Sequence, residues 1–217
     1  RIGALSRTTW ERGFSFIKKA GTIILLSTIL VWFMSTYGWV DGEWGAVEDM
    51  EDSILAAFGN LLCWIFSPLG WGDWKATVAA LTGLIAKENL VGTFGILYGF
   101  EEVEEAGDEI WTQLAANYTW LAAWSMLTFN LLCAPCFAAM GAIRREMNNW
   151  KWFLFAIAYQ CIFAWCVALC FYQIGMWIVT GTFGFWTFVA CALVVLCIYM
   201  LFRKGYMEKD IRAVSQR

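Results

Sequence analysis

The chain has 217 residues, of which 60% are hydrophobic, 18% are aromatic and only 15% are charged, with a formal net charge of -3. Soluble domains carry charges on about a quarter of their residues, so this composition excludes an ordinary soluble protein and indicates an integral membrane protein. The absence of histidine excludes sites that need histidine, and the eight cysteines lack the spacing of a secreted disulfide scaffold. Thiols, carboxylates and amides remain as the available chemistry.

The first part of the chain predicts a cytoplasmic start and one membrane crossing. Residues 1–19 hold five basic side chains and form a predicted cytoplasmic lead-in, and residues 20–39 are apolar over about the 20 residues that a crossing needs. The loop over residues 41–52 has six acidic and no basic residues, which places it outside. Because the chain starts with arginine and its opening is too polar for a signal peptide, we expect a piece of a longer polypeptide.

The next segments allow two layouts. Residues 54–66 are apolar but too few for a full crossing, which favours a short tilted helix or one arm of a re-entrant hairpin. A second helix is expected to open near Asp73, to carry residues 78–98, and to end before the acidic run at 101–109. We count six crossings if both segments cross the membrane, or four crossings and a hairpin if they do not.

The second half predicts a broken crossing followed by two long ones. Residues 120–137 form an apolar span that Pro135 interrupts near its inner end, where proline removes a hydrogen bond and frees a carbonyl about one turn upstream. Residues 152–174 cross outward and residues 183–202 return to a basic tail at 203–217. Both termini are therefore predicted to be cytoplasmic, in an all-α, polytopic membrane protein with about six transmembrane helices, including a short or re-entrant pair and a broken helix.

The sharpest functional signal lies at the centre of an apolar stretch over residues 82–99. Lys87, Glu88 and Asn89 interrupt this stretch, and a charged side chain at the bilayer centre costs about 2.5–3.5 kcal/mol even on lenient scales. Such residues usually face a water-filled path, so we expect a broken helix here, with Glu88 as a hard oxygen ligand and Lys87 as a replacement for a departing cation. A lysine that extends to the membrane surface and pairs with a neighbour is the alternative.

A second candidate site lies at the break before residue 137. Cys136 beside Pro135 could supply a thiol ligand, and thiol with carboxylate is a suitable set for Fe(II), although a lone membrane cysteine is more often a packing residue. Cys133 completes a Cys-x-x-Cys pair that could be redox-active. Asn130 lies upstream on the same helix as a further path residue. Other polar residues are expected to hold helices together: Ser125, Gln160, Cys166, Cys170 and Gln173.

These two motifs resemble the second, C-terminal gate region of the bacterial ferrous-iron transport protein B family. The first match is the Ala-Lys-Glu core at residues 86–88 with its Gly-Thr-x-Gly-x-Leu-Tyr continuation to residue 98. The second is Pro135-Cys136, followed in the same order by Met-Gly-Ala-Ile at 140–143 and Arg-Glu at 145–146. The resemblance spans roughly residues 12–201, and Cys133 is a departure from the family pattern, which has one cysteine at this place.

The resemblance implies that residues 1–217 form one transmembrane gate domain for Fe2+ uptake across the bacterial inner membrane. It implies coupling to a GTPase domain outside this chain, because no Gly-x-x-x-x-Gly-Lys-Ser/Thr loop occurs here. GTP and Mg2+ are therefore expected only in that other domain, and the chain is expected to be a transporter segment rather than an enzyme. Expected partners are the lipid bilayer, the first gate half and GTPase domain of its own chain, and a possible second copy, but no nucleic acid.

Two other functions stay open at this point. A nucleoside-type carrier shares the same gate region and would need an amide-rich, aromatic-lined site. A membrane scaffold or thiol-redox protein would use Cys133 and Cys136, although such motifs usually stand at the start of a helix in a soluble βαβ fold.

Overall fold

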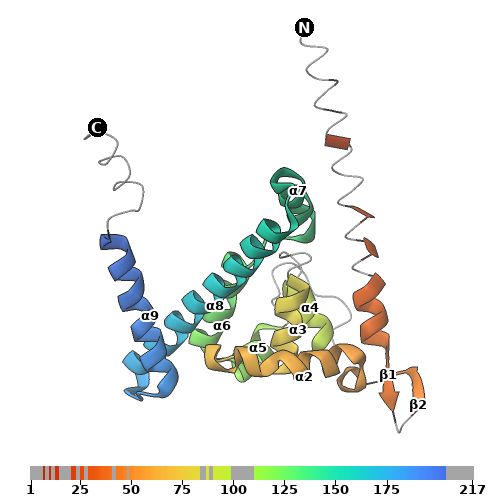
Figure 1. The fold of residues 1–217 in the computed structure, drawn as a ribbon. Coiled ribbons are helices and arrows are strands. Elements are labelled where there is room, and N and C mark those ends of the chain that lie inside the picture. The colour runs from red at the N-terminus through yellow and green to blue at the C-terminus, as the bar shows by residue number, and fades with distance from the viewer. Residues whose placement is uncertain are drawn as a thin grey trace.

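The computed structural model describes residues 29–40, 43–47, 49–83, 87, 90–98 and 110–203, with eight further positions between residues 7 and 26. A helical stretch at 29–36 leads into the following elements (Figure 1): β1 (Tyr37–Val40), β2 (Glu43–Ala46), η1 (Met50–Asp52), α2 (Ile54–Phe66), η2 (Ser67–Leu69), α3 (Trp74–Gly83), α4 (Leu90–Leu97), α5 (Trp111–Asn117), α6 (Trp120–Leu132), α7 (Phe137–Met147), α8 (Trp150–Thr180) and α9 (Phe185–Phe202).

The described chain is mostly helical, as predicted for an all-α membrane protein, but a short β-hairpin corrects the expectation of a helix that runs to residue 39. The helical stretch ends at residue 36, and β1 and β2 pair antiparallel from Tyr37 opposite Ala46 to Val40 opposite Glu43. The rings of Trp39 and Trp44 face each other across the strands, 4.5 Å apart. A cross-strand aromatic pair stabilises a sheet by about 0.2–1 kcal/mol, which favours strands over a last helical turn.

The chain turns sharply between α2 and α3. Their axes meet at 93°, because Pro68 and Gly70 end one helix and Asp73 begins the next. Gly70 has φ 90°, and a Cβ at this position would collide with the ring of Tyr172 on α8, so only glycine fits the turn. Asp73 Oδ1 accepts a hydrogen bond from the Ala76 amide at 2.9 Å and caps α3. The 13-residue helix α2 therefore lies across the direction of α3 (Figure 1).

Helices α3 and α4 form an antiparallel hairpin. The hydroxyls of Thr82 and Thr93 lie 3.2 Å apart at one end, and Lys75 Nζ lies 4.7 Å from the centre of the Tyr98 ring at the other. In one continuous helix, residues 82 and 93 would be about 16 Å apart at 1.5 Å per residue. The chain thus reverses between α3 and α4, and Lys87, the described residue between these helices, marks the tip of the hairpin. Both predicted layouts stay open, because α2 with α3 is a bent pair that is either a broken span or a re-entrant loop.

The predicted break at Pro135 separates α6 from α7. Residues 133–136 are not helical, and α7 ends at Met147, followed by Asn148 as a C-cap with a left-handed backbone and φ 44°. In the described part of the chain, α8 with 31 residues and α9 with 18 are long and apolar enough to cross a membrane, and α2 with α3 makes a third candidate only if that bent pair is one span. The predicted boundaries of these two long helices are close to those observed, whereas six crossings are not established.

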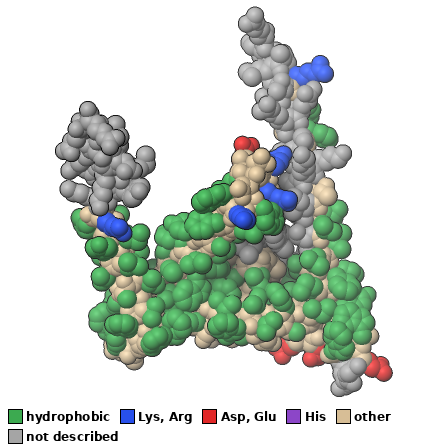
Figure 2. Space-filling view, in the orientation of Figure 1, with side chains coloured by type: hydrophobic (Ala, Val, Ile, Leu, Met, Phe, Trp, Pro, Cys, Tyr) green, Lys and Arg blue, Asp and Glu red, His purple; other side chains and the backbone are tan. Residues whose placement is uncertain are grey.

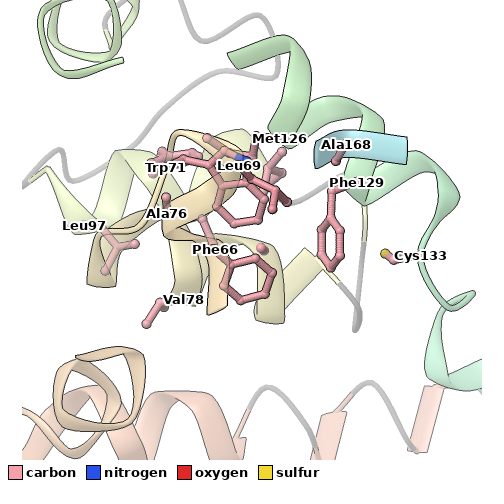
Figure 3. Close-up of a cluster of buried hydrophobic side chains, with 14 of the residues drawn as sticks. Phe66, Leu69, Trp71, Ala76, Val78, Leu97, Met126, Phe129, Cys133 and Ala168 are labelled. Atoms are coloured by element: carbon pink, nitrogen blue, oxygen red, sulfur yellow. The ribbon is translucent and has the colours of Figure 1, made fainter. Parts of the chain in front are cut away.

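The core lies where α2, α3, α6 and α8 meet. Phe66, Trp71 and Phe129 pack ring against ring, with centroids 4.5 to 5.6 Å apart (Figure 3). Small residues such as Ala76 and Ala168 are fully buried around them and let the helices approach closely. These contacts fix the base of the hairpin against the long helices.

Buried polar groups hold the same helices together. Trp71 Nε1 donates to Ser125 Oγ at 3.4 Å, and that hydroxyl donates to the Ala168 carbonyl at 3.2 Å. Gln173 Nε2 donates to the Pro68 carbonyl at 2.6 Å, and Cys170 Sγ contacts the Ala190 carbonyl at 3.5 Å. The predicted packing role of Ser125, Cys170 and Gln173 is therefore confirmed.

Most of the described charges separate towards two ends of the molecule (Figure 2). Basic side chains lie near α7, together with one acidic side chain, and at the end of α9, whereas the other acidic side chains seen in this view mark the lower edge near the β-hairpin. Hydrophobic side chains cover the surface between them, as expected of helices that face lipid.

The hairpin makes a direct prediction. Thr82→Cys with Thr93→Cys in a background without other cysteines should form a disulfide on oxidation with copper phenanthroline, because the two hydroxyls are 3.2 Å apart. Mass spectrometry of peptides detects the bond. The control pair Lys75→Cys with Thr93→Cys joins opposite ends of the hairpin and should stay reduced. Equal oxidation of the two pairs, or of neither, would contradict the hairpin.

Candidate functional site: two interrupted helices

The tip of the hairpin reaches the interrupted end of α6. Lys87 Nζ donates to the carbonyl oxygens of Leu131 and Cys133, each at 3.3 Å. Lys87 is half-buried, and its two acceptors are 44 and 46 residues away in sequence. One ammonium group thereby connects the break after α3 with the break after α6.

The two carbonyls are available because of Pro135. In a continuous helix, the amide of residue 135 would bond to the carbonyl of Leu131, but proline has no N–H. α6 ends at Leu132, and Cys133 turns to an extended backbone with ψ 175°, so its own carbonyl also leaves the helical pattern. The C-terminal end of a helix carries partial negative charge, which favours a cation. The break therefore presents oxygen acceptors to Lys87.

Asn130, in the last turn of α6, carries an unpaired oxygen that faces α3. Its Nδ2 donates to the Met126 carbonyl at 3.1 Å, whereas its Oδ1 is buried and has no hydrogen-bond partner. The residue is only 6% exposed. Asn130 Oδ1 lies 2.8 Å from the place where a side chain on Gly83 would begin, so α3 approaches α6 here because residue 83 is glycine.

The two cysteines of the break differ in their surroundings. Cys133 is buried, with 4% exposure, and its Sγ donates to the Asn130 carbonyl at 3.3 Å. Cys136 is half-buried and precedes α7, where its carbonyl accepts the Met140 amide at 2.9 Å. Both are free thiols. The side chain of Cys133 is therefore buried against the end of α6, and the sulfur of Cys136 is the more accessible of the two.

The structure brings together several residues that the sequence analysis singled out. Lys87 contacts the carbonyl of Cys133, and Cys133 Sγ contacts the carbonyl of Asn130. Pro135 acts at the same break through its missing N–H. Glu88 and Asn89 lie outside the described residues. The sequence analysis predicted a free carbonyl one turn before Pro135 but did not connect it with Lys87, and it missed the contact of Gly83 with Asn130. No sequence signal links those residues, because the contact joins two helices.

A metal site is not assembled within the described residues. They contain no group of three or more Cys, Asp or Glu side chains that could hold a metal ion. What they place at Lys87 are carbonyl and amide oxygens, which suit a hard cation. The predicted pairing of Cys136 with Glu88 thus stays a prediction.

The base of the hairpin is anchored separately. Tyr118, just before α6, donates its hydroxyl to Asp73 Oδ2 at 2.8 Å. Burial, together with the nearby Asp73 carboxylate, raises the pKa of Tyr118, so the phenol keeps the proton that it donates. Next to this anchor lies an open cleft of about 770 Å³, bordered by the acidic residues Asp49, Glu51 and Asp52 and by Lys75. Lys87 and this cleft are at opposite ends of the hairpin.

The close approach at Gly83 can be tested by a double-mutant cycle. Gly83→Ala should lower the free energy of unfolding by about 1–3 kcal/mol, because the added methyl group meets Asn130 Oδ1. In an Asn130→Ala background, which removes that oxygen, the same change should cost much less. Thermal unfolding of the four proteins in detergent measures the coupling. Equal costs in both backgrounds would contradict the contact.

Comparison with known proteins extends the sequence resemblance. A family model described as "Gate: Nucleoside recognition" matches residues 17–150. The chain is 37% identical over 179 residues to the Fe(2+) transporter FeoB of Methanocaldococcus jannaschii, covering 80% of this chain and 26% of that protein. It is 33% identical over 175 residues to the Fe(2+) transporter FeoB of Staphylococcus aureus strain COL, covering 80% of this chain and 25% of that protein.

A third relative is named as a fusion of two transport proteins. The chain is 30% identical over 207 residues to the Fe(2+) transport protein A/Fe(2+) transporter FeoB fusion protein of Porphyromonas gingivalis, covering 77% of this chain and 24% of that protein. The chain thus spans about a quarter of the length of these relatives. No solved structure matches it. The resemblance to the gate region of ferrous-iron transport protein B is confirmed, and the chain belongs to the Gate (nucleoside recognition) family.

Proposed function

We propose that the chain is the second gate half of a ferrous-iron transporter and helps to carry Fe2+ across the bacterial inner membrane. Three relatives that cover most of the chain are named Fe(2+) transporters, and the chain corresponds to about a quarter of each. The remaining parts, namely a first gate half and a GTPase domain that drives transport, belong to the rest of the same polypeptide. A second copy of the whole protein is a further possible partner.

The proposed layout has four crossings and one re-entrant hairpin. The chain crosses outward before β1, and α3 and α4 enter the membrane from outside and return. It then crosses inward along α6 and α7, outward along α8 and inward along α9. This layout is supported by the basic side chains near α7 and after α9, since basic residues favour the cytoplasmic side (Figure 2). Both termini are then cytoplasmic, with residues 1–19 and 203–217 as lead-in and tail.

The proposed cation path passes the place where the hairpin tip meets the end of α6. The observation that carries this assignment is the pair of hydrogen bonds from Lys87 to the carbonyls of Leu131 and Cys133. Interrupted helices with free carbonyls inside a membrane are a common way to bind transported cations. Glu88 follows Lys87 in sequence, and Cys136 is the last residue of the break before α7. We assign these two as transient Fe2+ ligands, because Fe2+ accepts both carboxylate and thiol donors.

A nucleoside carrier is the second candidate, and the family description favours it. One uptake assay with the full-length protein in proteoliposomes distinguishes the two candidate functions. Uptake of Fe2+ without uptake of radiolabelled uridine supports the iron transporter, whereas the reverse result supports the nucleoside carrier. The relatives named as Fe(2+) transporters lead us to expect the first outcome.

The ligand assignment predicts the behaviour of three variants of the full-length protein. Glu88→Gln and Cys136→Ser should each reduce Fe2+ uptake at least tenfold with GTP hydrolysis largely intact, because each removes one proposed ligand. Cys133→Ser is the matched control, since serine can still donate to the Asn130 carbonyl that Cys133 Sγ contacts at 3.3 Å. It should retain most of the uptake. Wild-type uptake by well-folded Glu88→Gln and Cys136→Ser proteins would show that neither residue is a ligand.

A further inference from the structure

We propose that the Lys87 ammonium is a tethered cation that fills the cation-binding place on the path while the gate is closed. On this proposal, a transported cation must displace the ammonium from the carbonyls of Leu131 and Cys133 before it can pass. The inference rests on the proposed transport function, and it adds how the same site is closed and opened.

The acceptors at Lys87 are those that a free cation would use. Two main-chain carbonyls at the negative end of α6 accept hydrogen bonds from Nζ at 3.3 Å each. A third oxygen, Asn130 Oδ1, belongs to the last turn of α6, faces Gly83 of α3, is buried and has no hydrogen-bond partner. Buried oxygens are nearly always paired in folded proteins, so an unpaired one in the turn that precedes the two carbonyls supports a place for a ligand at this helix end. Carbonyl and amide oxygens bind hard cations through the same lone pairs that accept from an ammonium.

The length of these hydrogen bonds suits a group that must leave. Charge-assisted N–H···O bonds are usually about 2.7–2.9 Å long, so contacts of 3.3 Å hold the ammonium loosely. A lysine also has a flexible four-carbon stem, so its head can leave while its backbone stays. Repulsion between the ammonium and an arriving divalent cation excludes their joint presence at such short range. The two carbonyls can therefore bind either the Lys87 ammonium or the transported ion, but not both at once.

The fold supports this arrangement at both ends of the hairpin. Tyr118 holds the base through Asp73 at 2.8 Å, and the Thr82 and Thr93 hydroxyls, 3.2 Å apart, join the arms near the tip. Between these anchors, the ammonium of Lys87 is held at α6 by its two carbonyl contacts, and no carboxylate among the described residues pairs with it. Release of the ammonium then opens the path while the hairpin stays in place, and its return closes the path again.

The test uses the full-length protein in proteoliposomes without GTP, with Fe2+ influx followed by quenching of entrapped calcein and Na+ influx by a tracer. Lys87→Met should raise both passive fluxes at least tenfold, because the methionine side chain leaves the carbonyls unoccupied. Lys87→Arg keeps the charge and should stay closed. Lys75→Met is the matched control at the other end of the hairpin and should behave like the wild type.

Asn130→Asp provides a second variant in case Lys87→Met does not fold. The new carboxylate would add a negative charge one residue before Leu131, in the turn that precedes the two carbonyls, and should attract the ammonium more strongly. GTP-driven Fe2+ uptake should therefore fall several-fold while the passive fluxes stay at the wild-type level. Passive fluxes of a folded Lys87→Met protein equal to those of the wild type would overturn the proposal, as would undiminished uptake by Asn130→Asp. If the wild type with GTP moves no Fe2+ but Lys87→Met opens to Na+, the iron function fails and the closing role of Lys87 stands.

Discussion

The pair of hydrogen bonds from Lys87 to the end of α6 is the interaction on which the rest of the site depends. Removing a charged group from water is very costly unless other groups pair with it, and here two carbonyls at 3.3 Å supply that pairing. Pro135 makes one of them available because it cannot donate to Leu131. The ammonium and the helix break therefore stabilise each other, and neither would be expected alone in a membrane.

The other elements place these two partners. The long helix α8 is the support against which η2, α6 and α9 pack, and the buried hydrogen bonds of Trp71 and Gln173 join the same region. The hairpin of α3 and α4 is fixed at its base by Asp73 and Tyr118. Gly83 lets the hairpin approach Asn130 on α6 near the tip. A firm support and a hairpin anchored at one end suit a gate in which only a side chain has to move.

Much of this arrangement could be predicted from sequence because it depends on local chemistry. The apolar runs located α8 and α9, Pro135 located the break after α6, and Lys87 stood out as a charge in an apolar stretch. The β-hairpin was missed, although Asp41 and Gly42 between two aromatic segments are a two-residue turn signal. Reversal of the chain between α3 and α4 was not distinguishable from a crossing, because both have the same apolar composition. The contact of Lys87 with α6 depends on tertiary packing, and the roles of Glu88 and Asn89 stay predictions.

The reactivity of Lys87 tests the central contact most directly. Trace acetylation of the full-length wild-type protein with acetic anhydride, read by mass spectrometry, compares Lys87 with the exposed Lys151 in the same sample. If the ammonium is held by the two carbonyls, Lys87 should react at least tenfold more slowly than Lys151, and addition of Fe2+ should raise its rate. A Lys87 that reacts as fast as Lys151 and is indifferent to Fe2+ would contradict the account.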